Sequence, residues 1–143
     1  MNRLATLDEN LVNEVRQRSL AELARICGEA AALSLTNSEI HDEFLDACLS
    51  RILAGESLSV PELSSMARIV EALDDEQWAL HENADSEAES TRALIAFRRA
   101  RAANALLLAS AVENRDIACE VLYESYASGV DLESLRCLVR DEF

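Results

Sequence analysis

The chain has 143 residues, of which 50% are hydrophobic and 28% are charged, a composition that excludes wholesale disorder and repetitive fibres. Its 13 basic residues are all arginines and stand against 27 acids, so the formal net charge is −14. This charge argues against binding to nucleic-acid phosphates or anionic lipid, because both depend on an excess of positive charge. With three glycines and one proline, the chain has few sites for tight turns, which argues against an all-β fold.

The length and the absence of targeting segments predict one cytoplasmic domain, residues 1–143. Residues 1–9 contain no apolar run of signal-peptide length, and no stretch approaches the roughly 18 uncharged apolar residues of a membrane span. The four cysteines show no CxxC spacing and lie within helical apolar patterns, so we expect reduced thiols in the core rather than disulfides or zinc ligands.

Four segments match the capping-box pattern, in which a hydroxyl accepts the backbone N–H three residues on while a glutamate reaches back. They are Thr6–Glu9, Thr36–Glu39, Ser59–Glu62 and Ser86–Glu89. A helical apolar pattern follows each of them, so each predicts the beginning of a helix.

The resulting fold prediction is an all-α, single-domain antiparallel bundle of five to seven helices. The first helix is expected over residues 7–33, with a break or kink near Gly28 as an alternative. The second is expected over residues 37–54, and the third begins after Ser59. Residues 74–80 either continue the third helix or form a short helix of their own.

The fourth helix is expected over residues 87–112, and its many alanines permit close contact with other helices, which favours a central position. Asn114 or Asp116 is expected to cap a fifth helix that ends at Gly129. Asp131 is expected to cap a short last helix.

The acids are unevenly distributed along the chain. Residues 37–91 contain 14 acids and two arginines, a net −12 out of the total −14. One interpretation is that these acids form solvated faces and favourable helix N-termini. The other is a surface that steers a basic partner protein. That surface predicts partner-binding roles for Asp42, Glu43, Asp46, Asp74, Asp75, Glu76, Trp78, Glu82, Asp85 and Glu87.

Two features of this region keep alternatives open. Trp78 lies next to the acidic run and either belongs to the core or anchors a partner. Three arginines follow the acidic run: Arg98, Arg99 and Arg101. They either pair with nearby acids or hold an anionic group of a ligand.

The search for catalytic chemistry favours a protein that is not an enzyme. His41 and His81 lie far apart on polar segments, and the Glu-x-x-His pattern of carboxylate metal sites in helical bundles is missing. The sequence contains no glycine-rich phosphate loop and no GxSxG motif. We therefore expect no catalytic residue, no metal and no cofactor.

Three functions are considered on these grounds. The first is a protein-binding inhibitor or neutraliser, since small acidic helical domains without cofactors are typical of bacterial immunity proteins and phage-encoded inhibitors; no motif assigns a family. The second is a structural or regulatory bundle that forms a homodimer or larger oligomer through its alanine-rich helix or an exposed apolar face. The third is an enzyme or small-ligand binder with a pocket beside the arginines. We predict the first, with the oligomeric bundle as the alternative.

Overall fold

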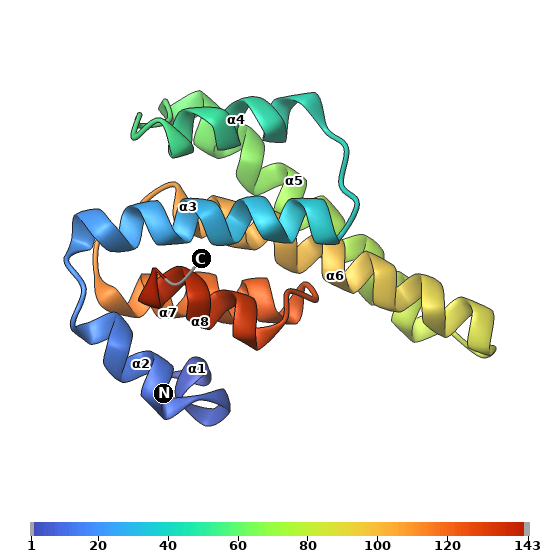
Figure 1. Cartoon of the computed structure of the whole chain (residues 1–143). Helices are drawn as coiled ribbons and strands as arrows, with labels where there is room; N and C mark the ends of the chain where they lie inside the picture. The colour runs from blue at the N-terminus through green and yellow to red at the C-terminus, as the bar shows by residue number, and fades with distance from the viewer. Residues whose placement is uncertain (1, 142–143) are drawn as a thin grey trace.

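The computed structural model describes residues 2–141, whose regular structure is entirely helical (Figure 1). The predicted all-α class is confirmed, but the described residues form eight helices rather than five to seven. They are α1 (Arg3–Leu7), α2 (Glu9–Arg16), α3 (Leu20–Asn37), α4 (Glu43–Leu53), α5 (Val60–Asn83), α6 (Glu87–Ala109), α7 (Arg115–Ala127) and α8 (Leu132–Arg140).

The single helix predicted over residues 7–33 is wrong, because two side chains begin new helices within it. The Asp8 carboxylate accepts the N–H of Leu11 and starts α2, from an extended backbone conformation. The Ser19 hydroxyl accepts the N–H of Glu22 and starts α3. Serine and aspartate are favoured at such positions because they satisfy N–H groups that lack a partner within the helix.

Gly28, where a break was considered, lies inside α3 without interrupting it. A Cβ at this position would lie 3.2 Å from a Leu53 methyl and 3.5 Å from an Ile52 methyl. The glycine therefore allows the end of α4 to lie close against α3.

The predicted second helix begins later than expected, and the capping box at Thr36 is wrong. Thr36 lies within α3, which ends at Asn37. Glu39 then adopts a left-handed conformation with φ 57°, and the N–H of Ile40 bonds to the carbonyl of Leu35, the geometry of a helix end. Asp42 caps α4 instead, because its carboxylate accepts the N–H of Leu45.

The predictions for the third and fourth helices agree better with the structure. Ser59 and Glu62 form a complete capping box at the start of α5, and the Ser86 hydroxyl caps α6. Residues 74–80 continue α5, which is one helix of 24 residues. Asn114 and Asp131 cap α7 and α8 as expected.

The centre of the molecule lies where α3, α6 and α7 contact one another. Small side chains allow this close packing, because Ala102, Ala103 and Ala105 of α6 are fully buried. Leu106 and Leu122 fill the space around them. The alanines that the sequence offered for self-association are thus used inside the chain.

The cysteine prediction is also largely confirmed. All four thiols are free; Cys27, Cys48 and Cys119 are buried, and Cys137 is half-buried. Burial raises the pKa of the Cys27 thiol to about 12, so this thiol is un-ionised at neutral pH.

An ion-pair cluster fixes the corner between α4 and α5. Arg51, in the last turn of α4, bonds to the Glu62 carboxylate in the first turn of α5 and to the carbonyl of Ser57 between them. The Ser59 N–H, followed by the Arg51 guanidinium, lowers the pKa of Glu62 from 4.5 to about 2. The corner is therefore stabilised by an ionised Glu62.

The lowered pKa predicts a pH dependence of stability. A carboxyl whose pKa is lower in the folded than in the unfolded state contributes stability above the unfolded value, and loses it as pH falls through the folded value. The thermal midpoint of the wild type should therefore exceed that of Glu62→Gln above pH 4.5, with the difference shrinking towards pH 2. Thermal unfolding followed by circular dichroism checks this; a constant difference across that range would contradict it.

Candidate functional site

The second half of α5 and the first half of α6 form a helical hairpin that projects away from the other helices (Figure 1). We call residues 71–97 the arm. Ala93, Ala96 and Ala100 face α5 and are buried, so the two helices lie close together. Phe97 and His81 meet edge to face, with ring centroids 6.4 Å apart. The arm is thus a two-helix layer whose outer sides remain open.

One side of α5 in the arm carries three accessible acids and a tryptophan. Glu71, Asp75, Trp78 and Glu82 are separated by four, three and four residues, the spacing that places side chains on one face of a helix. All four are exposed, and they lie opposite the buried residues Met66, Val70 and Gln77. None of the three carboxylates forms an ion pair with a residue of the described range 2–141. We call these four residues the acidic face.

Trp78, the sole tryptophan, lies in the middle of the acidic face with 63% of its surface exposed. The core position considered from the sequence is therefore wrong. Burial of a large aromatic side chain is worth several kcal/mol, and that stabilisation is forgone here. An exposed tryptophan between carboxylates is the strongest indication of a binding surface on this chain.

The exposed indole predicts a charge-selective response to fluorescence quenchers. The negative carboxylates around Trp78 attract cations and repel anions, so caesium should quench its emission more efficiently than iodide when each ion is compared with its quenching of free N-acetyltryptophanamide. The difference should shrink at high salt, and in the double variant Asp75→Asn, Glu82→Gln. The same ratio of caesium to iodide quenching in the wild type and in free N-acetyltryptophanamide would contradict an acidic environment.

Asp74, which was predicted to contact a partner, is engaged within the chain instead. It pairs with Arg101 of α6, and Arg101 also contacts Glu124 of α7, at 2.9 Å. The fully buried Glu124 accepts a further bond from Arg3 of α1, at 2.9 Å. This chain of ion pairs joins four helices at the base of the arm. Of the three arginines considered as an anion clamp, Arg101 is thus occupied by local acids.

The acids of α4 lie on a different part of the molecule from the acidic face. Asp42 is half-buried and uses its carboxylate as the cap of α4. Glu43 and Asp46 are exposed in the first turn of α4, where the helix dipole favours acids. Asp42 also lines a pocket of about 360 Å³. Leu73 of α5 and Arg99 of α6 line the same pocket, so it adjoins the base of the arm.

Three further predicted residues lie elsewhere on the arm, two of them at its tip. Glu76 is exposed on α5 but lies outside the helical spacing of the acidic face. Asp85 is exposed in the turn, where its N–H donates to Glu89 at 3.3 Å. Glu87 is exposed in the first turn of α6. Asp85 and Glu87 extend the negative charge around the tip.

The other two arginines, Arg98 and Arg99, follow the arm directly on α6. Arg98 and Arg99 line a pocket of about 270 Å³ with Asn37 and Ser38 of the α3 end. Arg99 donates to the Ser38 carbonyl at 3.4 Å, which compensates the negative end of α3. Arg98 also lines a second pocket, of about 480 Å³, between α6 and α7. Sequence reasoning placed these arginines together but missed the aromatic pocket beside them.

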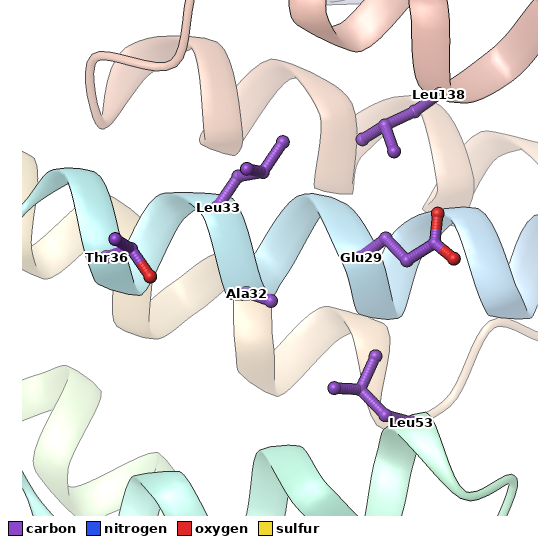
Figure 2. A pocket seen from close by; sticks show the side chains of 6 residues that line it. All are labelled: Glu29, Ala32, Leu33, Thr36, Leu53 and Leu138. Atoms are coloured by element: carbon purple, nitrogen blue, oxygen red, sulfur yellow. The ribbon is translucent and has the colours of Figure 1, made fainter. Parts of the chain in front are cut away.

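An apolar pocket of about 310 Å³ lies between α3, α4 and α8 (Figure 2). Leu33, Leu53 and Leu138 line it, and Glu29 and Thr36 are also part of its wall. The side chain of Leu33 is substantially exposed at this pocket. The pocket has almost no polar lining, which suits an apolar group rather than a polar ligand.

Residues 2–141 offer neither a metal site nor a membrane-spanning helix. No group of three or more His, Cys, Asp or Glu side chains in this range could hold a metal ion. None of the described helices is both long enough and apolar enough to cross a membrane. No protein-family model, curated protein or solved structure matches the chain, so the acidic face and its exposed Trp78 carry the functional interpretation.

Proposed function

We propose that the chain is a protein-binding module that covers a basic surface of a partner protein with the acidic face and thereby inhibits or neutralises that partner. The observation that carries this proposal is the 63% exposure of Trp78 between Asp75 and Glu82. Tryptophan is among the residue types that contribute most to binding energy at interfaces. Its flanking carboxylates supply charge complementarity towards a basic partner.

The shape of the arm supports the same role. A projecting two-helix hairpin can enter a groove that a flat surface could not reach (Figure 1). The net charge of −14 attracts a basic partner over a distance and raises the association rate, an effect that salt reduces. In this proposal the charges govern rate and orientation, while burial of Trp78 supplies affinity. The role is one of binding, without a cofactor and without contact to nucleic acid or membrane.

The proposal is tested by capture from cells that produce the protein. The immobilised wild type is compared with a variant of the acidic face, Asp75→Asn, Trp78→Ala, Glu82→Gln. The control variant, Glu113→Gln, Asp116→Asn, also removes two negative charges, but it does so near the α6–α7 turn, at the other end of α6. We expect a protein with a basic surface to bind the wild type and the control but not the first variant. Equal capture by all three proteins would contradict the proposal.

A further inference from the structure

The pocket between α6 and α7 at the base of the arm combines an arginine with aromatic side chains. Its volume is about 480 Å³, within the range of sites that bind ligands or large side chains. Phe97, Tyr123 and Tyr126 provide aromatic walls, and Leu94 and Arg98 come from α6. Leu94 is 43% exposed and Tyr126 is 40% exposed. We call this the Arg98 pocket.

Arg98 is an accessible cation at this pocket. Its side chain is exposed, and within residues 2–141 no acid forms an ion pair with it, whereas Arg101 one turn later pairs with Asp74 and Glu124. Arg98 lies against the α7–α8 turn, because a Cβ at Gly129 would be in ordinary van der Waals contact with its Nε, at 3.5 Å. The carboxylate of Asp131, which also lines the pocket, accepts two bonds from Ser134 instead.

We infer that the Arg98 pocket binds the acidic face of a second copy of this chain, with Trp78 of that copy inserted among its aromatic side chains. Indole rings pack favourably against tyrosine and phenylalanine, and tryptophan is the best acceptor of an arginine in a cation–π contact. Asp75 and Glu82 lie within one helical turn on either side of Trp78, so a carboxylate accompanies the indole to Arg98. The Arg98 guanidinium complements the carboxylates beside Trp78, and the aromatic side chains of the pocket complement the indole.

The contact joins two different surfaces, so it is head to tail. Trp78 lies on the face of α5 that points away from α6, and the pocket lies between α6 and α7. A contact between unlike surfaces closes into a ring or continues as a chain. This self-association occupies the acidic face, so it competes with the binding of a partner protein.

The salt dependence of binding distinguishes this self-association from the proposed binding of a basic partner. Two copies that each carry −14 repel one another at low salt, and screening removes this long-range repulsion while leaving the close contact at Trp78 and Arg98. Self-association should therefore strengthen from low to physiological salt. Binding of a basic partner should weaken over the same range. Either interaction can fail while the other persists.

Sedimentation of the full chain over a concentration series tests the inference through complementation. The wild type should form species that grow with concentration. Trp78→Ala and Arg98→Glu should each stay monomeric, because each lacks one half of the contact. Mixed together, they should form a dimer and grow no further, since the intact Trp78 of one variant meets the intact Arg98 of the other.

A charge reversal elsewhere serves as the control. Arg16→Glu, on the exposed surface of α2, should associate like the wild type. A wild type that remains monomeric at every concentration and salt would overturn the inference. So would a mixture of the two variants that forms no dimer, or variants that associate as the wild type does.

Discussion

Replacement of Glu124 by alanine should lower the free energy of unfolding by about 3 kcal/mol. Glu124 is fully buried and accepts bonds from Arg3 of α1 and Arg101 of α6. Without Glu124, the largely buried guanidinium of Arg101 keeps only Asp74 as an acidic partner. The Nε of Arg101 already lacks a hydrogen-bond acceptor within the described residues. Removing one side of a buried ion pair is costly because the remaining charge is left desolvated.

Glu120 provides a matched control on the same helix, one turn earlier. It also pairs with Arg3, but its side chain is 34% exposed and Arg3 is itself accessible. Glu120→Ala should therefore cost less than about 1 kcal/mol, as exposed ion pairs do. Urea unfolding of both variants, with the denaturant slope checked for constancy, measures the difference. Equal losses in the two variants would show that burial of Glu124 does not contribute as described.

Replacement of Trp78 by alanine should weaken binding to the captured partner by about 2 kcal/mol, or about 30-fold in the dissociation constant. The effect should appear mainly in the dissociation rate, because an apolar anchor stabilises the complex once it has formed. Neutralising Asp75 and Glu82 should instead slow association and reduce its salt dependence. Binding kinetics measured at several salt concentrations distinguish the two contributions.

Val60 allows a control for the loss of an exposed apolar side chain. It is 75% exposed on the same helix, but it lies at the start of α5, outside the arm. Val60→Ala should leave the affinity unchanged, and Trp78→Phe should restore part of it. An affinity that is equally insensitive to Trp78→Ala would mean that the partner does not contact this residue.

The sequence predicted the fold class because helical periodicity and caps are local properties. Ser59, Asn114 and Asp131 cap helices where the pattern indicated. Thr36 fits the capping-box pattern, as Ser59 does, but lies inside α3, since that pattern does not show whether a helix is already in progress. The segment Ser19–Glu22 carries an equally good signal, which the long apolar stripe of the expected first helix concealed.

The ion pairs at the base of the arm could not be predicted in this way. Asp74 and Arg101 are 27 residues apart, and they meet only because α5 and α6 form a hairpin. Arg3 and Glu124 are separated by 121 residues. Such contacts depend on tertiary packing, which local spacing does not determine.

The candidate site was predicted in part. Counting acids indicated the segment around Asp75 and Glu82, but counting alone grouped them with Asp42 and Asp74, which the structure uses as a cap and as an ion-pair partner. The four–three–four spacing that begins at Glu71 is visible in the sequence and would have separated the acidic face from the rest. The Arg98 pocket is not visible there, because α7 closes it from a distant part of the chain.

The most direct test of the acidic face as a binding surface is residue-resolved amide hydrogen exchange of the full chain, with and without the captured partner. Binding through this face should slow exchange in residues 71–83 of α5 and leave α2 and α8 unchanged. Slower exchange elsewhere, with residues 71–83 unaffected, would contradict the account.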